Sequence, residues 1–93
     1  MLNNEEMALL DSLLMEKIEA EQSRVKRTDQ QLGEQAFGWL KSPKMKIQSI
    51  KGYGDRKAQQ LRLADYLNLC EALGLSWVDI CKEAIKAVKA SGK

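Results

Sequence analysis

Residues 41–51 read KSPKMKIQSIK, and this stretch has the pattern of a short basic helix. Ser42 suits the N-cap, where its hydroxyl accepts a free backbone N–H, and Pro43 suits the first helical position. At about 100° per residue, Ile47 and Ile50 share one face with the Pro43 ring. The sequence therefore predicts a helix that begins at Pro43 and buries a narrow apolar edge.

The opposite face of this helix is polar and basic. It comprises the residues that point away from the two isoleucines: Lys44, Met45, Gln48 and Ser49, with Lys46 and Lys51 on its flanks. Residues 41–51 contain four lysines and no acidic residue, and this mutual repulsion is costly for a helix that merely covers a core. The pattern suits a helix presented to phosphates, although a solvated lysine-rich surface also explains it.

The basic charge is concentrated in the middle of the chain. The 93 residues have a net charge of +2, but residues 1–23 hold six acids against Lys17, for a net −5. Residues 24–62 hold ten basic residues against three acids, for a net +7, and residues 63–93 are balanced. This asymmetry favours a polyanion as the partner.

The composition predicts one soluble, mainly helical domain over residues 1–93. Apolar residues make up 44% and charged residues 30%, with a single proline. No apolar run approaches the roughly 20 residues that span a bilayer, and the first residues lack the pattern of a secretion signal. We therefore expect no membrane association and a cytoplasmic location.

The two cysteines and the missing histidines argue against a metal site and against catalysis. Cys70 and Cys81 do not have redox-motif spacing, and without histidine they cannot form a standard zinc site. We interpret both as small buried hydrophobic residues. No glycine-rich phosphate loop or paired carboxylates in an apolar setting are evident, so we expect no enzyme and no cofactor.

Two helices are expected before the basic one. The first begins at Asn3 or Asn4, is acidic outside, and carries a long apolar stripe that includes Met7, Leu10 and Leu14. This stripe lies across the core or contacts the second subunit of a homodimer. The alternative subunit contact is on the last helix, at Ile85 and Val88.

The second helix opens with a capping-box pattern, Thr28 with Gln31. Gly33 in its middle favours a close crossing with another helix. In the turn that follows, we interpret Trp39 and Leu40 as core residues rather than as a surface on which bases stack.

Two more helices are expected after the basic one. Gly52 suits a C-cap, and a fourth helix runs from about Gln60 or Leu61 to Leu73, where Gly74 ends it. Its apolar stripe comprises Leu63, Tyr66, Leu67, Cys70 and Leu73. A Ser76 cap then starts the last helix.

Residues 66–80, YLNLCEALGLSWVDI, resemble the closing helices of the lambda-repressor-like (Xre-type) helix-turn-helix DNA-binding domains. In that family a helix ends in Ala-Leu-Gly-Val/Leu-Ser and the final helix follows at once. Residues 28–32 are similar to the family's Thr-Gln-x-x-Leu, and Ile47, Ile50 and Gly52 match in kind. The resemblance implies an all-α, five-helix lambda-repressor-like domain with an extended first helix and a helix-turn-helix core at about residues 28–52. The turn before the third helix and the loop after Gly52 are longer than in the family.

The resemblance implies a sequence-specific double-stranded DNA-binding transcriptional regulator. Small members are phage or plasmid repressors or autoregulating antitoxins, which act as homodimers on the prokaryotic nucleoid. Their third helix contacts base edges, which implicates Lys44, Met45, Gln48 and Ser49. Phosphate contacts are implied for Gln30, Lys41, Lys46, Lys51, Arg56, Lys57 and Arg62.

The alternative is a protein-interaction module that keeps the helix-turn-helix scaffold and binds a partner protein through its acidic first helix. Binding to random duplex DNA that weakens steeply with salt would favour the regulator, and absence of such binding would favour the module. RNA is less favoured, because single-strand binding proteins usually display aromatic stacking surfaces.

Overall fold

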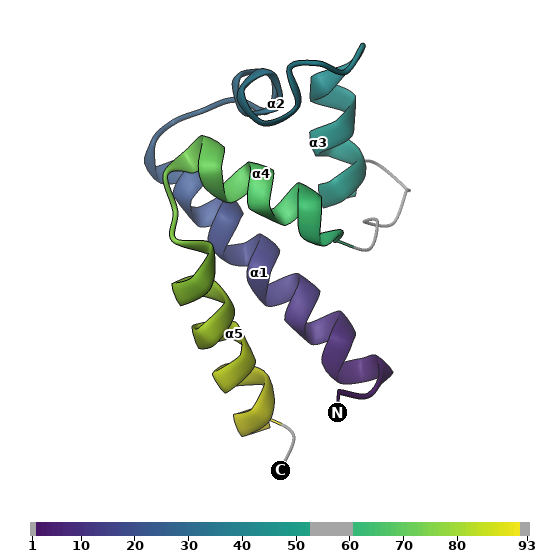
Figure 1. The fold of residues 1–93 in the computed structure, drawn as a ribbon, viewed down its shortest axis with the longest axis vertical. Coiled ribbons are helices and arrows are strands. Elements are labelled where there is room, and N and C mark those ends of the chain that lie inside the picture. The colour runs from purple at the N-terminus through teal and green to yellow at the C-terminus, as the bar shows by residue number, and fades with distance from the viewer. Residues whose placement is uncertain (1, 53–60, 92–93) are drawn as a thin grey trace.

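The computed structural model describes residues 2–52 and 61–91, which form five α-helices and, within these ranges, no strand. The helices are α1 (Asn4–Arg24), α2 (Asp29–Phe37), α3 (Pro43–Lys51), α4 (Leu63–Leu73) and α5 (Trp77–Ser91). Figure 1 shows α2 and α3 at one end of the molecule, α4 in the middle, and α1 beside α5. The expected all-α class is confirmed.

Local sequence signals set several helix ends. The Thr28 hydroxyl accepts a hydrogen bond from the backbone N–H of Gln31, while the Gln31 side chain accepts one from the Thr28 N–H. Asn3 and Glu6 form the same reciprocal pair at the start of α1. Gly74 adopts the left-handed conformation (φ 69°) that ends α4, as expected for a glycine C-cap.

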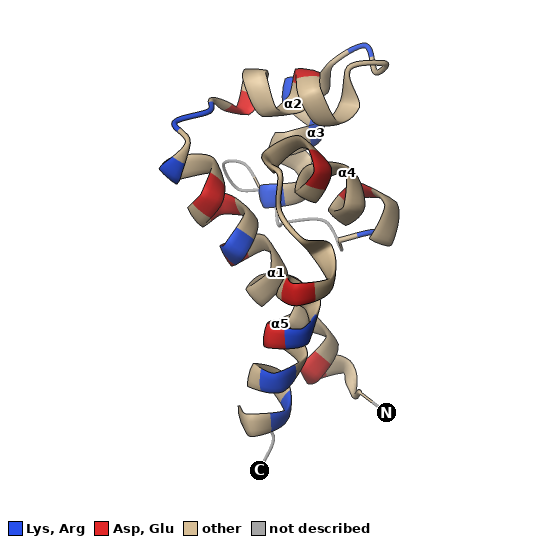
Figure 2. Ribbon diagram, turned by 60° about the vertical axis from the view of Figure 1, so that its left-hand side comes forward, with Lys and Arg blue, Asp and Glu red and all other residues tan. Residues whose placement is uncertain are grey.

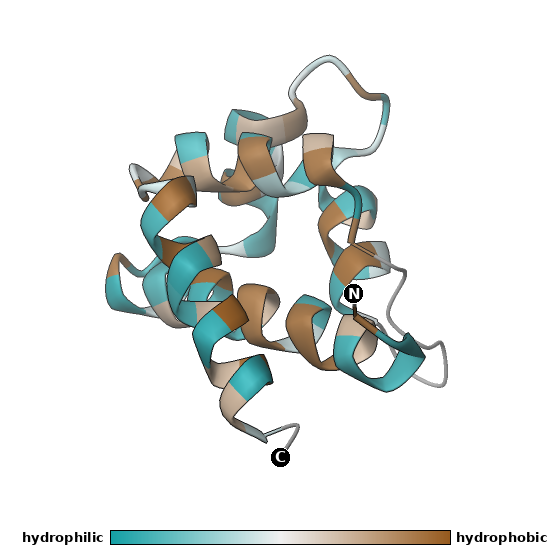
Figure 3. Ribbon diagram, turned by 60° about the horizontal axis from the view of Figure 1, so that its bottom comes forward, coloured by the Kyte–Doolittle hydropathy of each residue, from teal (hydrophilic) through white to brown (hydrophobic). Residues whose placement is uncertain are grey.

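One continuous apolar core joins all five helices. It consists of Leu14 and Ile18 from α1, Leu32, Ala36 and Phe37 from α2, Ile47 and Ile50 from α3, Tyr66, Leu69, Cys70 and Leu73 from α4, and Ile80 and Ala84 from α5. Each large side chain buried in this way stabilises the fold by about 1.5–3 kcal/mol relative to exposure. Figure 3 shows the hydrophobic segments of the separate helices turned toward one another.

The interpretation of the two cysteines as core thiols agrees with the structure. Cys70 is buried and Cys81 is partly buried, and both are free. The Cys81 thiol donates a long hydrogen bond (3.5 Å) to the Tyr66 hydroxyl, which in turn donates to the backbone carbonyl of Trp77 at 2.6 Å. Burial, with the nearby Cys81 thiol, raises the pKa of the Tyr66 hydroxyl, which therefore stays protonated as a donor.

The predictions about the turn before α3 are confirmed only in part. Ser42 is the N-cap residue of α3, as expected, but its side chain makes no capping hydrogen bond, because its backbone (φ −131°, ψ 76°) lacks the extended conformation that Thr28 adopts at the start of α2. The prediction that Trp39 and Leu40 are core residues is wrong. Trp39 is 71% exposed and Leu40 is also exposed. The turn at 38–42 leaves the helical body after Phe37, which takes the core position instead.

The fourth helix also differs from its prediction. It begins at Leu63 rather than at Gln60 or Leu61, and Gln60 lies outside the described residues. Leu63 is 68% exposed, because the buried face of α4 starts one turn later, at Tyr66. Leu69, which the expected stripe omitted, is part of the core.

Candidate nucleic-acid interface

Helices α2 and α3 cross closely at Gly33. A Cβ atom at this position would lie 2.7 Å from both the carbonyl carbon and the carbonyl oxygen of Pro43, and 3.1 Å from the backbone nitrogen of Lys44. Backbone atoms cannot move aside as a flexible side chain can, so a larger residue would displace the start of α3. The close crossing predicted from Gly33 is confirmed, and it seats the N-terminal end of α3 on α2.

A polar cluster holds the other end of α3. We call it the Gln22 cluster, and it consists of Gln22, Arg27, Asp29 and Lys51. The Lys51 Nζ lies 2.7 Å from the Asp29 Oδ1 and 2.6 Å from the Gln22 Oε1. The Gln22 Nε2 donates to the Asp29 Oδ1 at 2.9 Å and to the Arg27 carbonyl at 3.0 Å. The cluster therefore joins the ends of α1 and α3 to the start of α2.

Gln22 is the buried member of the Gln22 cluster, and Arg27 ties the cluster to α4. Gln22 is only 7% exposed, and all of its amide hydrogen bonds are made inside the chain. The Arg27 guanidinium donates to the carbonyl of Ala72 near the end of α4. A buried polar group loses its hydration, so a glutamine in this position is stabilising only when it is fully paired, as it is here.

The charge of Asp29 is favoured by its neighbours. Burial alone would raise the pKa of this carboxyl, but hydrogen bonds from Gln22 and Lys51 and the positive charges of Lys51 and Lys44 outweigh burial. The net effect is a pKa below the ordinary range of aspartate. At neutral pH the cluster therefore contains a charged ion pair between α2 and α3.

The outer face of α3 is accessible mainly at its N-terminal end. Lys44 is exposed, and the Met45 side chain is 60% exposed. Gln48 and Ser49, one turn later, are half-buried. Of the four residues implicated in base contacts, two are therefore exposed to solvent and two are half-buried.

Two lysines implicated in phosphate contacts have partners within the chain. The Lys46 Nζ lies 3.1 Å from the Asp65 Oδ2 of α4 and 5.6 Å from the centre of the Phe37 ring. Lys51 belongs to the Gln22 cluster. Both side chains are mostly buried, and each ammonium forms an ion pair that joins α3 to another helix. No local pattern in the sequence indicates these long-range pairs.

The other residues implicated in phosphate contacts divide into two groups. Lys41 and Arg62 are exposed, and Gln30 is exposed with its amide donating to Glu34 at 2.6 Å. Arg56 and Lys57 lie outside the described residues. In Figure 2 the turn that leads into α3 projects from the body of the molecule and carries a basic segment. The exposed lysines near the start of α3 are therefore Lys41 and Lys44.

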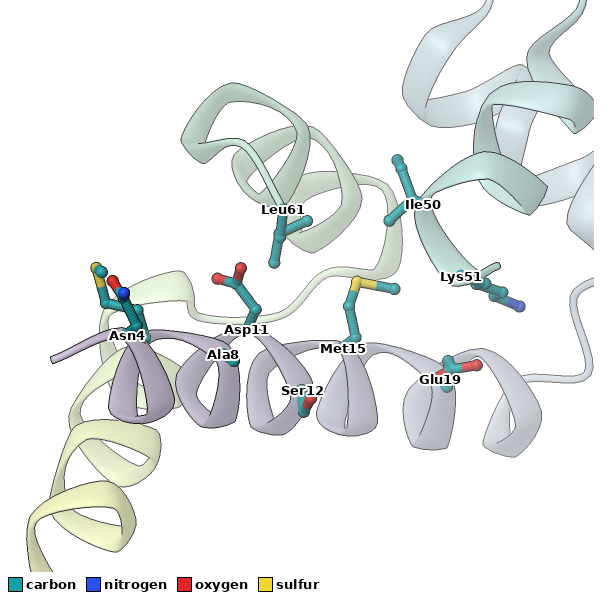
Figure 4. A pocket seen from close by; sticks show the side chains of 10 residues that line it. Asn4, Ala8, Asp11, Ser12, Met15, Glu19, Ile50, Lys51 and Leu61 are labelled. Atoms are coloured by element: carbon teal, nitrogen blue, oxygen red, sulfur yellow. The ribbon is translucent and has the colours of Figure 1, made fainter. Parts of the chain in front are cut away.

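A groove of about 610 Å³ runs along α1. It is lined by Asn4, Met7, Ala8, Asp11, Ser12, Met15 and Glu19 of α1, by Ile50 and Lys51 of α3, and by Leu61. Figure 4 shows Met15 directed toward Ile50 and Asp11 directed toward Leu61. The groove is mixed in character, with apolar side chains beside two carboxylates.

The residues expected at a subunit contact differ in their exposure. Met7 is exposed and lines the groove, and Leu10 is half-buried. Leu14 is a member of the core and is not available to a second subunit. On α5, Ile85 is exposed whereas Val88 is fully buried. Only Met7, Leu10 and Ile85 retain surface for such a contact.

No family model, curated protein or solved structure with which we compared the chain matches it. Within residues 2–52 and 61–91, no helix is both long enough and apolar enough to cross a membrane. The same residues contain no group of three or more histidine, cysteine or acidic side chains that could hold a metal ion.

Proposed function

We propose that the chain is a sequence-specific double-stranded DNA-binding transcriptional regulator in which α2 and α3 form a helix-turn-helix and α3 enters the major groove. The observation that carries the proposal is the presentation of α3. The helix is seated at one end by Gly33 and at the other by the Gln22 cluster, while Lys44 and Met45 face outward. The major groove admits an α-helix, and a rigidly held helix loses little freedom on binding.

The side chains at the start of α3 have the chemistry for contacts to base edges. Lys44 would donate to the acceptors of guanine, and Met45 would contact a thymine methyl group. Gln48 would form a bidentate pair with adenine, and Ser49 would accept or donate beside it. Lys41 and Arg62, which are exposed, would bind phosphates and set the register without contributing sequence preference.

The size of the chain favours action as a pair. One small domain covers limited DNA surface, and two copies on half-sites one helical turn apart would raise affinity. We propose a homodimer of the lambda-repressor-like (Xre-type) kind, a small repressor or autoregulating antitoxin of the prokaryotic or phage cytoplasm. The similarity of residues 66–80 to that family supports this, and Met7 and Leu10 remain contact candidates.

Selection of bound duplexes from a random pool tests the proposal, followed by titration of the enriched duplex over a range of salt concentrations. We expect enrichment of one two-fold symmetric sequence and an affinity that falls steeply with salt. A pool that stays random, with salt-independent binding, would contradict DNA recognition. Sedimentation of the complex then distinguishes one copy from two.

The groove along α1 favours one second candidate, a protein-interaction module. Its apolar residues and its two carboxylates, Asp11 and Glu19, fit an amphipathic basic helix of a partner protein. Under this candidate, Met15→Glu would abolish partner binding, whereas Lys44→Ala would leave it unchanged. If the chain is a DNA-binding regulator, Lys44→Ala should weaken DNA binding, whereas Met15→Glu should leave DNA binding unchanged.

A further inference from the structure

Trp39 is the most exposed large hydrophobic residue that the structure describes, at 71%. It lies in the turn at 38–42, which projects beyond the helices at the N-terminal end of α3 (Figures 1 and 3). Its indole packs against the buried Phe37 ring in a T-shaped arrangement, with ring centres 5.8 Å apart and planes at 68°. The indole is thus held by Phe37, and most of its surface faces solvent.

Glycine is needed for the path that places Trp39 there. A Cβ atom at Gly38 would lie 2.6 Å from the carbonyl oxygen of Glu34, one turn back in α2. A side chain at this position would collide with that backbone, so the chain could not leave α2 in the same direction. The projecting tryptophan is therefore set by the backbone before it.

The surroundings of Trp39 are apolar and basic together. Leu40 and Met45 are exposed, as are Lys41 and Lys44, and no acidic residue occurs between Glu34 and Asp55. In a two-fold contact with a second copy, each lysine would face a lysine-bearing surface, which is unfavourable. A polyanion that also offers apolar surface meets both features, and the sugar–phosphate backbone of DNA is such a partner.

We propose that Trp39 binds the sugar–phosphate backbone of duplex DNA at the edge of the groove that α3 enters. The face of its indole packs on a deoxyribose, its Nε1–H donates to a phosphate oxygen, and Lys41 neutralises a neighbouring phosphate. The indole N–H is a donor only, and phosphate oxygens are acceptors only. The contact rests on the proposed DNA binding and adds a residue that strengthens binding to every duplex sequence alike.

Tryptophan fluorescence tests the contact directly, because the chain has only two tryptophans. The variant Trp77→Phe leaves Trp39 as the sole reporter. Tyr66 bonds to the backbone carbonyl of Trp77, so this exchange keeps that hydrogen bond. With the enriched duplex at low salt, we expect acrylamide quenching of Trp39 to fall severalfold. In Trp39→Phe, quenching of Trp77 on α5 should not change with DNA.

Affinity measurements give a second readout. Trp39→Ala should weaken the enriched duplex and an unrelated duplex equally, by about tenfold, which corresponds to about 1.4 kcal/mol. Trp39→Phe should recover part of this loss, because it keeps the apolar face and lacks only the N–H donor. Trp77→Ala is the matched control, since Trp77 is also exposed (49%) but lies on α5. It should leave both affinities unchanged.

The outcomes separate this contact from DNA binding itself. If the unaltered chain binds duplex DNA while Trp39 stays open to acrylamide and Trp39→Ala binds equally well, the Trp39 contact is wrong and the proposed function stands. If the unaltered chain binds no duplex, both the Trp39 contact and the proposed function are wrong. Stronger protection by single-stranded DNA, or protection that follows self-association without DNA, would also overturn the duplex contact.

Discussion

The ammonium of Lys51 lies 2.7 Å from the carboxylate of Asp29, and this ion pair joins the end of α3 to the start of α2. The two residues are 22 positions apart, and Gln22 bonds to both of them. Together with the crossing at Gly33, the pair fixes α3 at both ends. The orientation of the proposed recognition helix is therefore set by contacts within the chain before DNA is present.

Lys51→Ala tests whether this lysine is structural. The variant leaves Asp29 charged and the Gln22 amide oxygen without a donor, so it should reduce the free energy of unfolding by about 1–3 kcal/mol. Urea denaturation measures the change, with exposed Lys86→Ala as the control that should be neutral. Unchanged stability, with a salt slope of DNA binding lowered by about 1, would instead make Lys51 a phosphate contact.

The Asp29 carboxyl gives the fold a defined acid dependence. Its pKa is lower in the folded chain than in the unfolded chain, so its contribution to stability is fully present above the ordinary aspartate pKa, about 3.9. That contribution is lost as the pH falls through the folded-state pKa. Urea denaturation at a series of acidic pH values should show this loss, and Asp29→Asn should remove that part of the profile. Parallel profiles for both proteins would contradict the ion pair.

Gly33→Ala tests the close crossing of α2 and α3. Alanine in the middle of an exposed helix would normally be stabilising by about 1 kcal/mol relative to glycine. Here the added methyl meets the Pro43 backbone, so we expect a net loss of about 1–3 kcal/mol. Thermal unfolding measures it, with Gln35→Ala on the exposed side of α2 as the control. A more stable Gly33→Ala would show that α3 does not pack so closely.

The thiols should differ in reactivity. Burial raises the pKa of the Cys70 thiol, and buried thiols react slowly because the thiolate is the reactive form. In Cys81→Ser, native labelling of Cys70 should therefore be much slower than labelling in denaturant. Cys81, which is partly buried, should react faster in Cys70→Ala. Rapid native labelling of Cys70 would place it outside the core.

Helix ends that depend on residues close together along the chain can be predicted from the sequence. The Thr28–Gln31 capping box, the Gly74 helix end and the Pro43 helix start are local, and each is present. Gly33 indicates a close crossing because a small residue in the middle of a helix needs a packing reason. The prediction for Trp39 is wrong because an apolar residue does not indicate whether the turn that carries it returns to the core.

The long-range polar contacts could not be predicted in the same way. Nothing in the spacing of Gln22, Asp29 and Lys51 indicates that they meet, since their approach depends on how three helices pack. The ion pair of Lys46 could not be predicted for the same reason, because its partner Asp65 lies on another helix, α4. Helical periodicity places both lysines on the flanks of α3, and the family resemblance implies phosphate contacts for them. Neither indicates a neighbouring carboxylate.

Helix α3 is proposed to distinguish base sequences, and two variants, Gln48→Ala and Lys41→Ala, test this most directly. The affinity of each variant is measured for the enriched duplex and for an unrelated duplex, over a range of salt concentrations. Gln48→Ala should cost about 1–3 kcal/mol on the enriched duplex only, and relax the preference at one base pair. Lys41→Ala should weaken both duplexes alike and lower the salt slope by about 1. Equal losses on both duplexes from both variants would mean that α3 lies along the phosphate backbone and does not contact base edges.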